Sequence, residues 1–242
     1  IYLAQNFSQK EINICHGIYH PEDCLYLSSL ALKRKKYIKF NQTICLDLFH
    51  KNSLIFVSKQ SLPFTIGLKD SESFLYKKKA NYAPMPIEIN NKLLKKRTLK
   101  NDKINIICIS RFVDFKIASI ISLIKLVKNH KKFNLNIIGY GVYRPILVLY
   151  LFLNKVKNVK LIGKVDQVNL SKYIDSNDIG YAQGTAILEI AKFGLPVIVA
   201  PYSKLLNLFD SKYKTLGFFS IDALENEFGD TSNYKDLKSY SI

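Results

Sequence analysis

The stretch QGTAILEIAKFGLPVIVA, residues 183–200, is the segment on which our interpretation of the fold depends. A short polar loop precedes apolar residues at helical spacing, and this pattern ends at Gly194. Pro196 then begins the apolar run PVIVA, which has the length and composition of a buried strand. A loop, a helix and a strand in this order predict one repeating unit of an α/β sheet.

Upstream of this stretch, the same alternation extends back to about residue 104. Short apolar runs typical of strands occupy residues 104–110, 133–141, 158–163 and 178–183. Segments typical of helices occupy residues 116–130, 144–157 and 169–177. Because the loops are short and the strands are apolar, we expect a Rossmann-like parallel sheet with helices on both faces. The segment PILVLYLFL is too short to span a bilayer and is predicted to be a buried helix.

The part of the chain before residue 104 is less regular. It contains predicted strands at 11–15 and 53–58, a predicted helix at 22–36 and an extended connection with two prolines at 81–89. We therefore predict a short or truncated α/β domain at 1–88, a basic linker at 89–103 and the Rossmann-like domain at 104–242. The first domain is shorter than the roughly 100–150 residues of a common domain, and residue 1 is Ile, so we expect an incomplete chain.

The net charge of +17 is unevenly distributed along the chain. It is +10 over residues 1–100, +8 over 101–200 and −1 over 201–242, and the densest basic runs lie at 33–36, 77–79 and 92–100. Such a surface attracts anionic lipid headgroups, phosphorylated substrates or nucleic acid, and a merely solvated surface is the plainer interpretation. We do not expect a nucleic-acid partner, because the chain has no aromatic-interleaved basic motif, zinc module or recognisable recognition helix.

Cysteine and histidine spacing favours neither disulfides nor a metal centre. The four cysteines form no CxxC pair, and they predict buried thiols in a reducing compartment. His16 and His20 are four residues apart, which on a helix would suit zinc. Gly17 and Pro21 disfavour a helix there, and no third ligand is evident. His16 follows a predicted strand, so it could instead line an acceptor cleft.

Three consecutive residues at the start of the helix in 183–200 predict an anion site. Gly184 lets the backbone approach a ligand closely, and Thr185 and Ala186 begin the helix with free N–H groups that suit phosphate. Glu189 lies one turn further on, where a carboxylate can accept hydrogen bonds from two adjacent hydroxyls, as on a ribose. The plainer alternative for Glu189 is a solvent-facing helix residue.

Two further loops are expected at the same edge of the sheet. Arg111 and Lys116 bracket the loop after the first predicted strand, where two cations could neutralise a diphosphate. Gly139 and Gly141 line the loop after the next strand. Together with the anion site they predict a nucleoside-diphosphate site. Surface charges and a simple turn are the alternatives for these loops, and the tyrosines at 140, 143 and 181 are interpreted as packing or rim residues.

The motifs ISRFVDFK, LNIIGYG, NVKLIGKV and YAQGTAILEIAKFGLPVIVA occur in this order across residues 104–200. They resemble the donor-binding domain of GT-B glycosyltransferases, and more narrowly the retaining group called family 4 or group 1. SLIFVSK and APMPIEI resemble the end of the acceptor domain and the crossover to the donor domain. Many members of the group carry two glutamates separated by seven residues. Here the second is Glu189, and Tyr181 occupies the first position.

The resemblance assigns roles to individual residues. Arg111 and Lys116 would bind the donor diphosphate and act in catalysis, and Glu189 would hold the ribose hydroxyls. The residues that would contact the donor through backbone or loop atoms are Gly139, Gly141, Lys164, Val165, Gly184, Thr185 and Ala186. Among these, Lys164 and Val165 would meet the base, and the last three would meet phosphate.

By the same resemblance, the protein is a hexosyltransferase that uses no cofactor and no metal. It would transfer a sugar from a nucleotide-diphosphate sugar to a glycan or lipid-linked acceptor in bacterial-type surface polysaccharide synthesis. Protein cations and helix dipoles would stabilise the leaving diphosphate. The enzyme would be cytoplasmic, with an anionic membrane surface on the inner face as a further partner. The alternative is a non-catalytic or degenerate GT-B-like module that binds nucleotide or a partner, which Tyr181 and the short first domain favour.

Overall fold

The computed structural model describes residues 16–18, 35–56, 80–83, 87, 102–201, 213–214, 218 and 239–240, with the backbone alone for 16, 18, 35–42, 213–214 and 239–240. The chain divides into two compact units, Ile1–Pro86 and Ile87–Ile242. Each unit has its own sheet.

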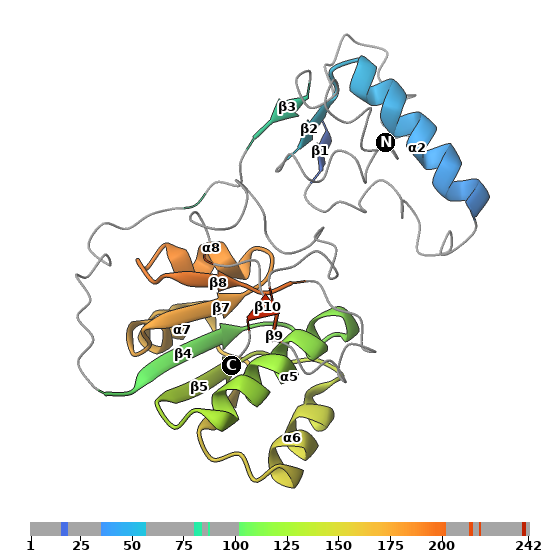
Figure 1. The fold of residues 1–242 in the computed structure, drawn as a ribbon. Helices are drawn as coiled ribbons and strands as arrows, with labels where there is room; N and C mark the ends of the chain where they lie inside the picture. Colours follow the sequence, from blue (N-terminus) through green and yellow to red (C-terminus); the bar gives the residue numbers. More distant parts are fainter. Residues whose placement is uncertain are drawn as a thin grey trace. The chain divides into compact units, whose positions relative to one another are not determined.

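The first unit contains a small parallel sheet and one long helix. The strands β1 (His16–Ile18), β2 (Leu54–Phe56) and β3 (Asn81–Tyr82) lie in the order β1-β2-β3, and α2 (Lys35–His50) precedes β2 (Figure 1). The apolar side of α2 packs on β2 through Cys45, Leu48 and Phe49. The strand predicted at 53–58 is confirmed as β2. Residues 11–15 and 22–34 lie outside the described residues, and α2 beyond residue 36 was not predicted.

The second unit is built on a five-stranded parallel sheet. The strands β4 (Ile104–Ile109), β5 (Phe133–Ile138), β6 (Val159–Gly163), β7 (Ile179–Ala182) and β8 (Val197–Val199) lie in the order β6-β5-β4-β7-β8. The helices α5 (Asp114–Asn129), α6 (Arg144–Leu153), α7 (Gln167–Asp175) and α8 (Ala186–Ala191) connect successive strands. The predicted alternation of strand and helix in a parallel α/β sheet is therefore confirmed.

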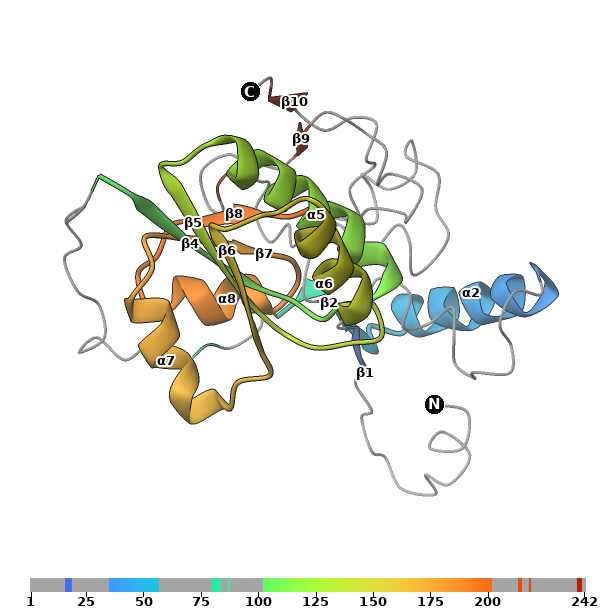
Figure 2. The same cartoon turned by 90° about the horizontal axis from the view of Figure 1, so that it is seen from below.

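Helices cover the two faces of this sheet in pairs, α5 with α6 and α7 with α8 (Figures 1 and 2). Successive strand side chains point to opposite faces, so β4 contributes to both layers. Ile106 and Cys108 belong to the core under α5 and α6, and Ile107 belongs to the core under α7 and α8. Burial on both faces explains why these strands consist mostly of apolar residues.

The prediction that PILVLYLFL forms a buried helix is only half right. The segment is helical, as α6, and Pro145 lies in its first turn as expected. Only Leu147 is buried, however, and the helix leaves five large apolar side chains exposed, namely Ile146, Val148, Leu149, Phe152 and Leu153. The reason is that α6 packs on the core with one side alone, through Leu147, Tyr150 and Leu151.

The chain reverses its direction of travel across the sheet between β4 and β7. It runs from β4 outward to β5 and β6, then returns through α7 to pair β7 with the other side of β4. The pairing brings the last residues of the two strands, Ile109 and Ala182, opposite each other. The loops that follow them therefore leave the sheet side by side, at the position where open α/β sheets bind their ligands.

The remaining described residues add two short features. The strands β9 (Tyr213–Lys214) and β10 (Ser239–Tyr240) form an antiparallel pair, and Phe218 makes an isolated bridge to Ile198 of the sheet edge. None of the helices in the described ranges combines the length and the apolar character needed to cross a bilayer.

Candidate functional site

Lys116 connects the two loops at the reversal point of the sheet. It lies in the first turn of α5, and its Nζ donates a hydrogen bond to the Gln183 carbonyl oxygen at 3.3 Å. The side chain is only 9% exposed, so its charge is held close to the β7–α8 loop rather than in bulk water. A buried cation next to that loop provides the local positive charge that an anionic ligand requires.

The electrostatic effect of Lys116 also reaches the core below it. Burial raises the pKa of the Cys108 thiol to about 12, and the positive charge of Lys116 offsets part of that rise. The predicted burial of the thiols is confirmed for Cys108 and for Cys45. Cys15 and Cys24 lie outside the described residues.

Arg111 lies in the loop after β4, five residues before Lys116, and its side chain is exposed. Its guanidinium makes no hydrogen bond or ion pair with any residue in the described ranges, although its backbone carbonyl accepts a hydrogen bond from Val113 N at 3.1 Å. Its position at the carboxyl end of β4 follows from the strand, which ends at Ile109. The Arg111 guanidinium is thus exposed to a ligand in solvent. The Lys116 ammonium, in contrast, is held in place by its hydrogen bond to the Gln183 carbonyl.

The loop with Gly139 and Gly141 packs directly against the loop that carries Arg111. Ser110 N donates to Ile138 O at 3.0 Å, and Phe112 N donates to Tyr140 O at 2.8 Å. A Cβ at Gly139 would lie 1.8 Å from the Ser110 oxygen, and one at Gly141 would lie 2.4 Å from the Phe112 oxygen. Both glycines are therefore required for this close backbone approach, whatever ligand the loop contacts.

The loop after β6 continues this row of loops. Gly139 N donates to Gly163 O at 2.8 Å, and the Lys164 ammonium lies 5.6 Å from the centre of the Tyr140 ring. A groove of about 550 Å³ opens beside it. The groove is lined by Lys164, Val165, Asp166, Asn169, Lys172, Tyr173 and Ser176. Lys164 and Val165, which were predicted to meet a base, thus line a concave surface at the start of α7.

The β7–α8 loop is only three residues long, from Gln183 to Thr185. Gly184 has φ of 70°, a conformation that glycine adopts at little cost. The first helical hydrogen bonds are donated by Ile187 to Gly184 O and by Leu188 to Thr185 O. The N–H groups of Gly184, Thr185 and Ala186 have no acceptor in the described part of the chain. These three adjacent donors can therefore bind an anion, although α8 itself spans only six residues.

Glu189 faces away from the sheet and toward the beginning of α7. Its Oε2 accepts a hydrogen bond from Gln167 Nε2 at 2.9 Å. The same oxygen forms an ion pair with Lys192 Nζ at 2.5 Å. The side chain is 38% exposed. Within the described ranges Oε1 has no partner, so one carboxylate oxygen remains for a ligand.

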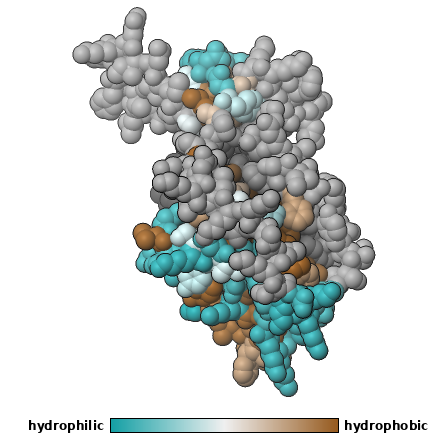
Figure 3. Space-filling view, turned by 90° about the vertical axis from the view of Figure 1, so that its left-hand side faces the viewer, coloured by the Kyte–Doolittle hydropathy of each residue, from teal (hydrophilic) through white to brown (hydrophobic). Residues whose placement is uncertain are grey.

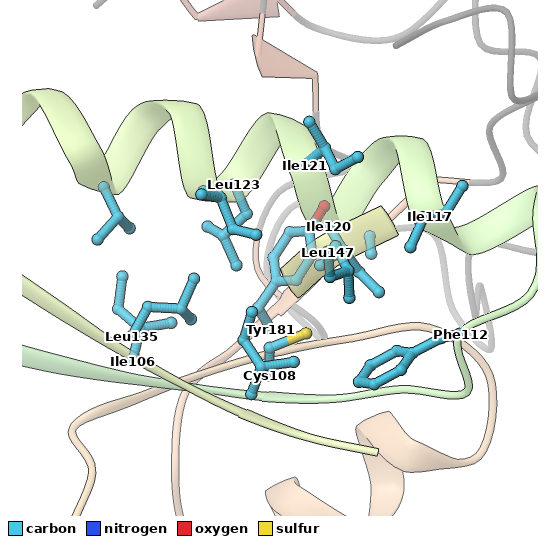
Figure 4. Close-up of a cluster of buried hydrophobic side chains, with 14 residues drawn as sticks. Ile106, Cys108, Phe112, Ile117, Ile120, Ile121, Leu123, Leu135, Leu147 and Tyr181 are labelled. Atoms are coloured by element: carbon cyan, nitrogen blue, oxygen red, sulfur yellow. The ribbon is translucent and has the colours of Figure 1, made fainter. Parts of the chain in front are cut away.

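Tyr181 occupies the place of the first glutamate in the GT-B pattern, and it lies in the core. The side chain projects from β7 toward α5 near Cys108, Ile120 and Leu147 (Figure 4), and it is 1% exposed. Its hydroxyl donates to Ser119 O at 3.3 Å. The predicted packing role of Tyr181 is confirmed. Tyr143 is also packed against this core, whereas Tyr140 is 54% exposed beside Lys164.

The described contacts join the predicted residues into two groups. Lys116 meets the β7–α8 loop at Gln183, and Glu189 meets Gln167, the first residue of α7. Arg111 is not joined to either group by a described contact. His16 is the first residue of β1 in the other unit, and its side chain lies outside the described residues. Among the described residues, no three His, Cys, Asp or Glu side chains gather where they could hold a metal ion.

Sequence reasoning did not identify Gln167, Gln183 or Lys192 as parts of the site. Lys192 could have been found, because an acidic and a basic residue three positions apart on a helix can pair. Nothing in the local sequence marks Gln167 or Gln183. Their roles depend on which strands are neighbours, and that is a property of the folded sheet.

Comparison with solved structures shows that the chain has a fold of the GT-B glycosyltransferase type. The structure of S. aureus TarM matches with a TM-score of 0.54 and 16% identity, over 79% of this chain and 37% of TarM. A TarM mutant solved with fondaparinux, alpha-GlcNAc-glycerol and UDP matches with a TM-score of 0.54 and 17% identity, over 80% of this chain and 38% of that one.

Anabaena HepE, solved with UDP and glucose, has a TM-score of 0.47 and 15% identity, over 69% of this chain and 50% of HepE. The chain thus spans half or less of the length of these structures. At these identities the likeness concerns the fold. The sequence matches no protein-family profile and no curated protein.

Proposed function

We propose that the chain is part of a glycosyltransferase and that its second unit binds a nucleoside-diphosphate sugar. The observation that carries this proposal is the buried Lys116 ammonium held at the β7–α8 loop, at the reversal point of a parallel sheet. Open α/β sheets bind ligands at this position, and a cation beside three N–H groups that have no acceptor among the described residues suits a diphosphate. The GT-B type of fold supports the choice of a sugar nucleotide.

In the proposed reaction the bond between the sugar anomeric carbon and the diphosphate oxygen breaks, and the nucleoside diphosphate leaves with the electron pair. The acceptor hydroxyl oxygen forms the new bond to the anomeric carbon, and its proton passes to the departing diphosphate. Lys116, Arg111 and the N–H groups of Gly184 to Ala186 would face the negative charge that develops on the leaving group. Glu189 would accept hydrogen bonds from the ribose through its remaining oxygen, and the groove at Lys164 would receive the base.

The finer assignments follow from the GT-B resemblance and belong to the same proposal. The enzyme would be a retaining, metal-independent transferase of family 4 type that acts on a glycan or lipid-linked acceptor in surface polysaccharide synthesis. It would work in the cytoplasm, at the inner face of an anionic membrane. The basic runs at 77–79 and 92–100, and residues 33–34 of the first run, lie outside the described residues.

A second candidate function is a GT-B-like module that binds nucleotide without turnover. One observation favours it, because the Tyr181 side chain lies inside the core, where it cannot contact a donor sugar. The two functions differ in one measurable respect. Both bind a nucleoside diphosphate, but only the enzyme releases it from a nucleotide sugar in the presence of an acceptor.

Calorimetric titration with UDP and with GDP tests the proposed site. We expect Lys116→Ala and Glu189→Ala each to weaken binding by roughly ten- to hundredfold, because each removes a hydrogen bond to a charged group. Lys128→Ala, at the other end of α5, is the matched control for the lysine. Lys192→Ala removes the ion pair but keeps the carboxylate, so it should change affinity much less than Glu189→Ala.

The same titrations can contradict the diphosphate site and the role of Glu189 separately. If neither diphosphate binds the folded protein, or if Lys116→Ala binds as well as the unaltered chain, the diphosphate site is wrong. If Glu189→Ala and Lys192→Ala weaken binding equally, Glu189 acts by joining α7 to α8 and not by holding a ribose.

A further inference from the structure

The helix α6 exposes a broad apolar face. Five of its side chains are 40–79% exposed, namely Ile146, Val148, Leu149, Phe152 and Leu153. At about 100° per residue, these positions occupy a continuous arc of about 160° around the helix. Contiguous apolar surface of this kind usually marks a place where a protein meets a partner or a membrane.

The part of the chain around α6 carries only positive charge. Residues 115–165 contain ten lysines and arginines and no aspartate or glutamate. Exposed cations lie at both ends of the helix, with Arg144 at its start and Lys155 and Lys157 just after its end. Lys128 reaches the same end from α5, and its Nζ donates to Asn154 Oδ1 at 3.3 Å.

The opposite layer of the second unit differs in charge. Residues 166–201, which include α7 and α8, contain two lysines against four acidic residues. The cations are therefore concentrated in the part of the chain that contains α5 and α6. In the space-filling view, brown apolar side chains lie beside teal hydrophilic ones toward the lower end, the level at which Figure 1 places α6 (Figure 3).

We propose that α6 docks the second unit onto an anionic lipid bilayer. The helix would lie in the plane of the headgroup region, with its apolar arc among the acyl chains and the surrounding lysines on the headgroups. A helix of ten residues is about 15 Å long, which suits an interfacial position and is too short to span the bilayer. This inference does not depend on the proposed function, since a chain without transferase activity would dock in the same way.

The charge pattern disfavours the other occupants of the apolar face. A second copy of the chain would bring two strongly cationic layers together, and like charges oppose such contact. A nucleic acid would match the lysines, but the five exposed side chains of α6 offer it no hydrogen-bond donors for phosphates. An acidic protein remains as an outcome of the test.

The absence of tryptophan from the chain allows a sharp experiment. Phe152→Trp places a single fluorescent reporter on the apolar arc. With vesicles of phosphatidylglycerol and phosphatidylcholine at low salt, we expect a blue shift of its emission and quenching by brominated acyl chains. Val168→Trp is the matched control, because Val168 is an apolar residue of α7 that is 85% exposed in the other layer. Its emission should remain that of a tryptophan in water.

Vesicle co-sedimentation supplies a second readout. The double variant Leu149→Gln, Phe152→Gln should bind the same vesicles at least roughly tenfold more weakly, because it removes two exposed apolar anchors. Val168→Gln should bind as the unaltered chain does. Lys155→Gln with Lys157→Gln should weaken binding at low salt, whereas Lys172→Gln on α7 should not, and added salt should weaken binding throughout.

Three outcomes overturn the proposal. One is equal vesicle binding by the Leu149, Phe152 double variant and the unaltered chain, when circular dichroism shows both to be folded. Another is an emission shift of Phe152→Trp with soluble polyglutamate but not with vesicles, which indicates an acidic protein partner. The third is a shift that follows protein concentration without vesicles, which indicates self-association.

Discussion

Lys116 illustrates how a residue acquires its role from the topology around it. A buried ammonium is costly unless polar groups replace its water, and here the Gln183 carbonyl does so at 3.3 Å. That carbonyl is available because β4 and β7 are neighbours and both end at the same level. The sequence places a lysine in the first turn of a helix, and the order of the strands then brings its side chain to the β7–α8 loop.

The thiol of Cys108 predicts a particular dependence of stability on pH. Burial raises the pKa of this thiol from its ordinary value of 9.0 to about 12, so between these values the thiol ionises only in the unfolded chain. The contribution of Cys108 to the free energy of unfolding should be constant below about pH 9 and should decline as the pH rises toward 12. Urea titrations across this range should show a shallower decline for Cys108→Ala than for the unaltered chain.

The chemical reactivity of the Cys108 thiol tests its burial independently of protein stability. A protonated, fully buried thiol reacts poorly with iodoacetamide, because the thiolate is the nucleophile. Cys108 should therefore remain unmodified in the folded protein at pH 8 and react after unfolding. Rapid modification in the native state would contradict the burial of this residue.

Position 139 requires glycine because a Cβ there would collide with the Ser110 backbone, and not only because glycine is flexible. Gly139→Ala would place a methyl group 1.8 Å from the Ser110 oxygen, so the two loops must separate. We expect this change to lower the free energy of unfolding by roughly 2 kcal/mol or more, in the range of overpacked sites. Gly163→Ala is the matched control, since Gly163 also has a positive φ, of 94°, but no atom within 4 Å of the added carbon.

Denaturant unfolding of Gly139→Ala and Gly163→Ala separates two causes of lost stability, the backbone conformation and the contact between the loops. If both lose the same amount of stability, the backbone conformation accounts for the cost and the close approach of the loops does not. A larger loss for Gly139→Ala assigns the difference to the contact.

At the scale of the elements, local pattern predicted the strands and helices of the second unit, because apolar spacing follows the period of each element. It failed for α6, since apolar composition does not tell whether a second layer covers a helix. It also missed most of α2. Central residues of α2 such as Asn41 and Thr43 are weak helix formers, and packing of the apolar side of the helix on β2 stabilises it instead.

The two sides of α6 should respond differently to truncation. Leu147→Ala removes a fully buried side chain and should cost about 2 to 5 kcal/mol of stability. Phe152→Ala removes a larger side chain that is 79% exposed, and it should change stability by no more than about 0.5 kcal/mol. Thermal or urea unfolding of both variants checks this contrast, and a large loss for Phe152→Ala would show that another part of the protein covers the helix.

At the scale of the whole molecule, the fold class follows from the sequence but the order of strands does not. The alternation of elements predicts a parallel sheet, and many orders of five strands satisfy it. The candidate site depends on the order, because Lys116 and Gln183 meet only when β7 lies beside β4. Single residues such as Arg111 and Glu189 could thus be proposed from motifs, whereas their neighbours required the structure.

The pairing of β7 with β4 also affects how the chain folds while it is being synthesised. Strands β4, β5 and β6 pair in the order in which a ribosome would release them, but the other edge of β4 stays open until β7 emerges. Asn105 and Asp178, whose N–Oδ2 hydrogen bond of 2.8 Å closes that edge, are 73 residues apart. An open strand edge is a template for pairing with other chains. The nascent chain is therefore most exposed to aggregation while α7 is being synthesised, and translation that pauses there would prolong the risk.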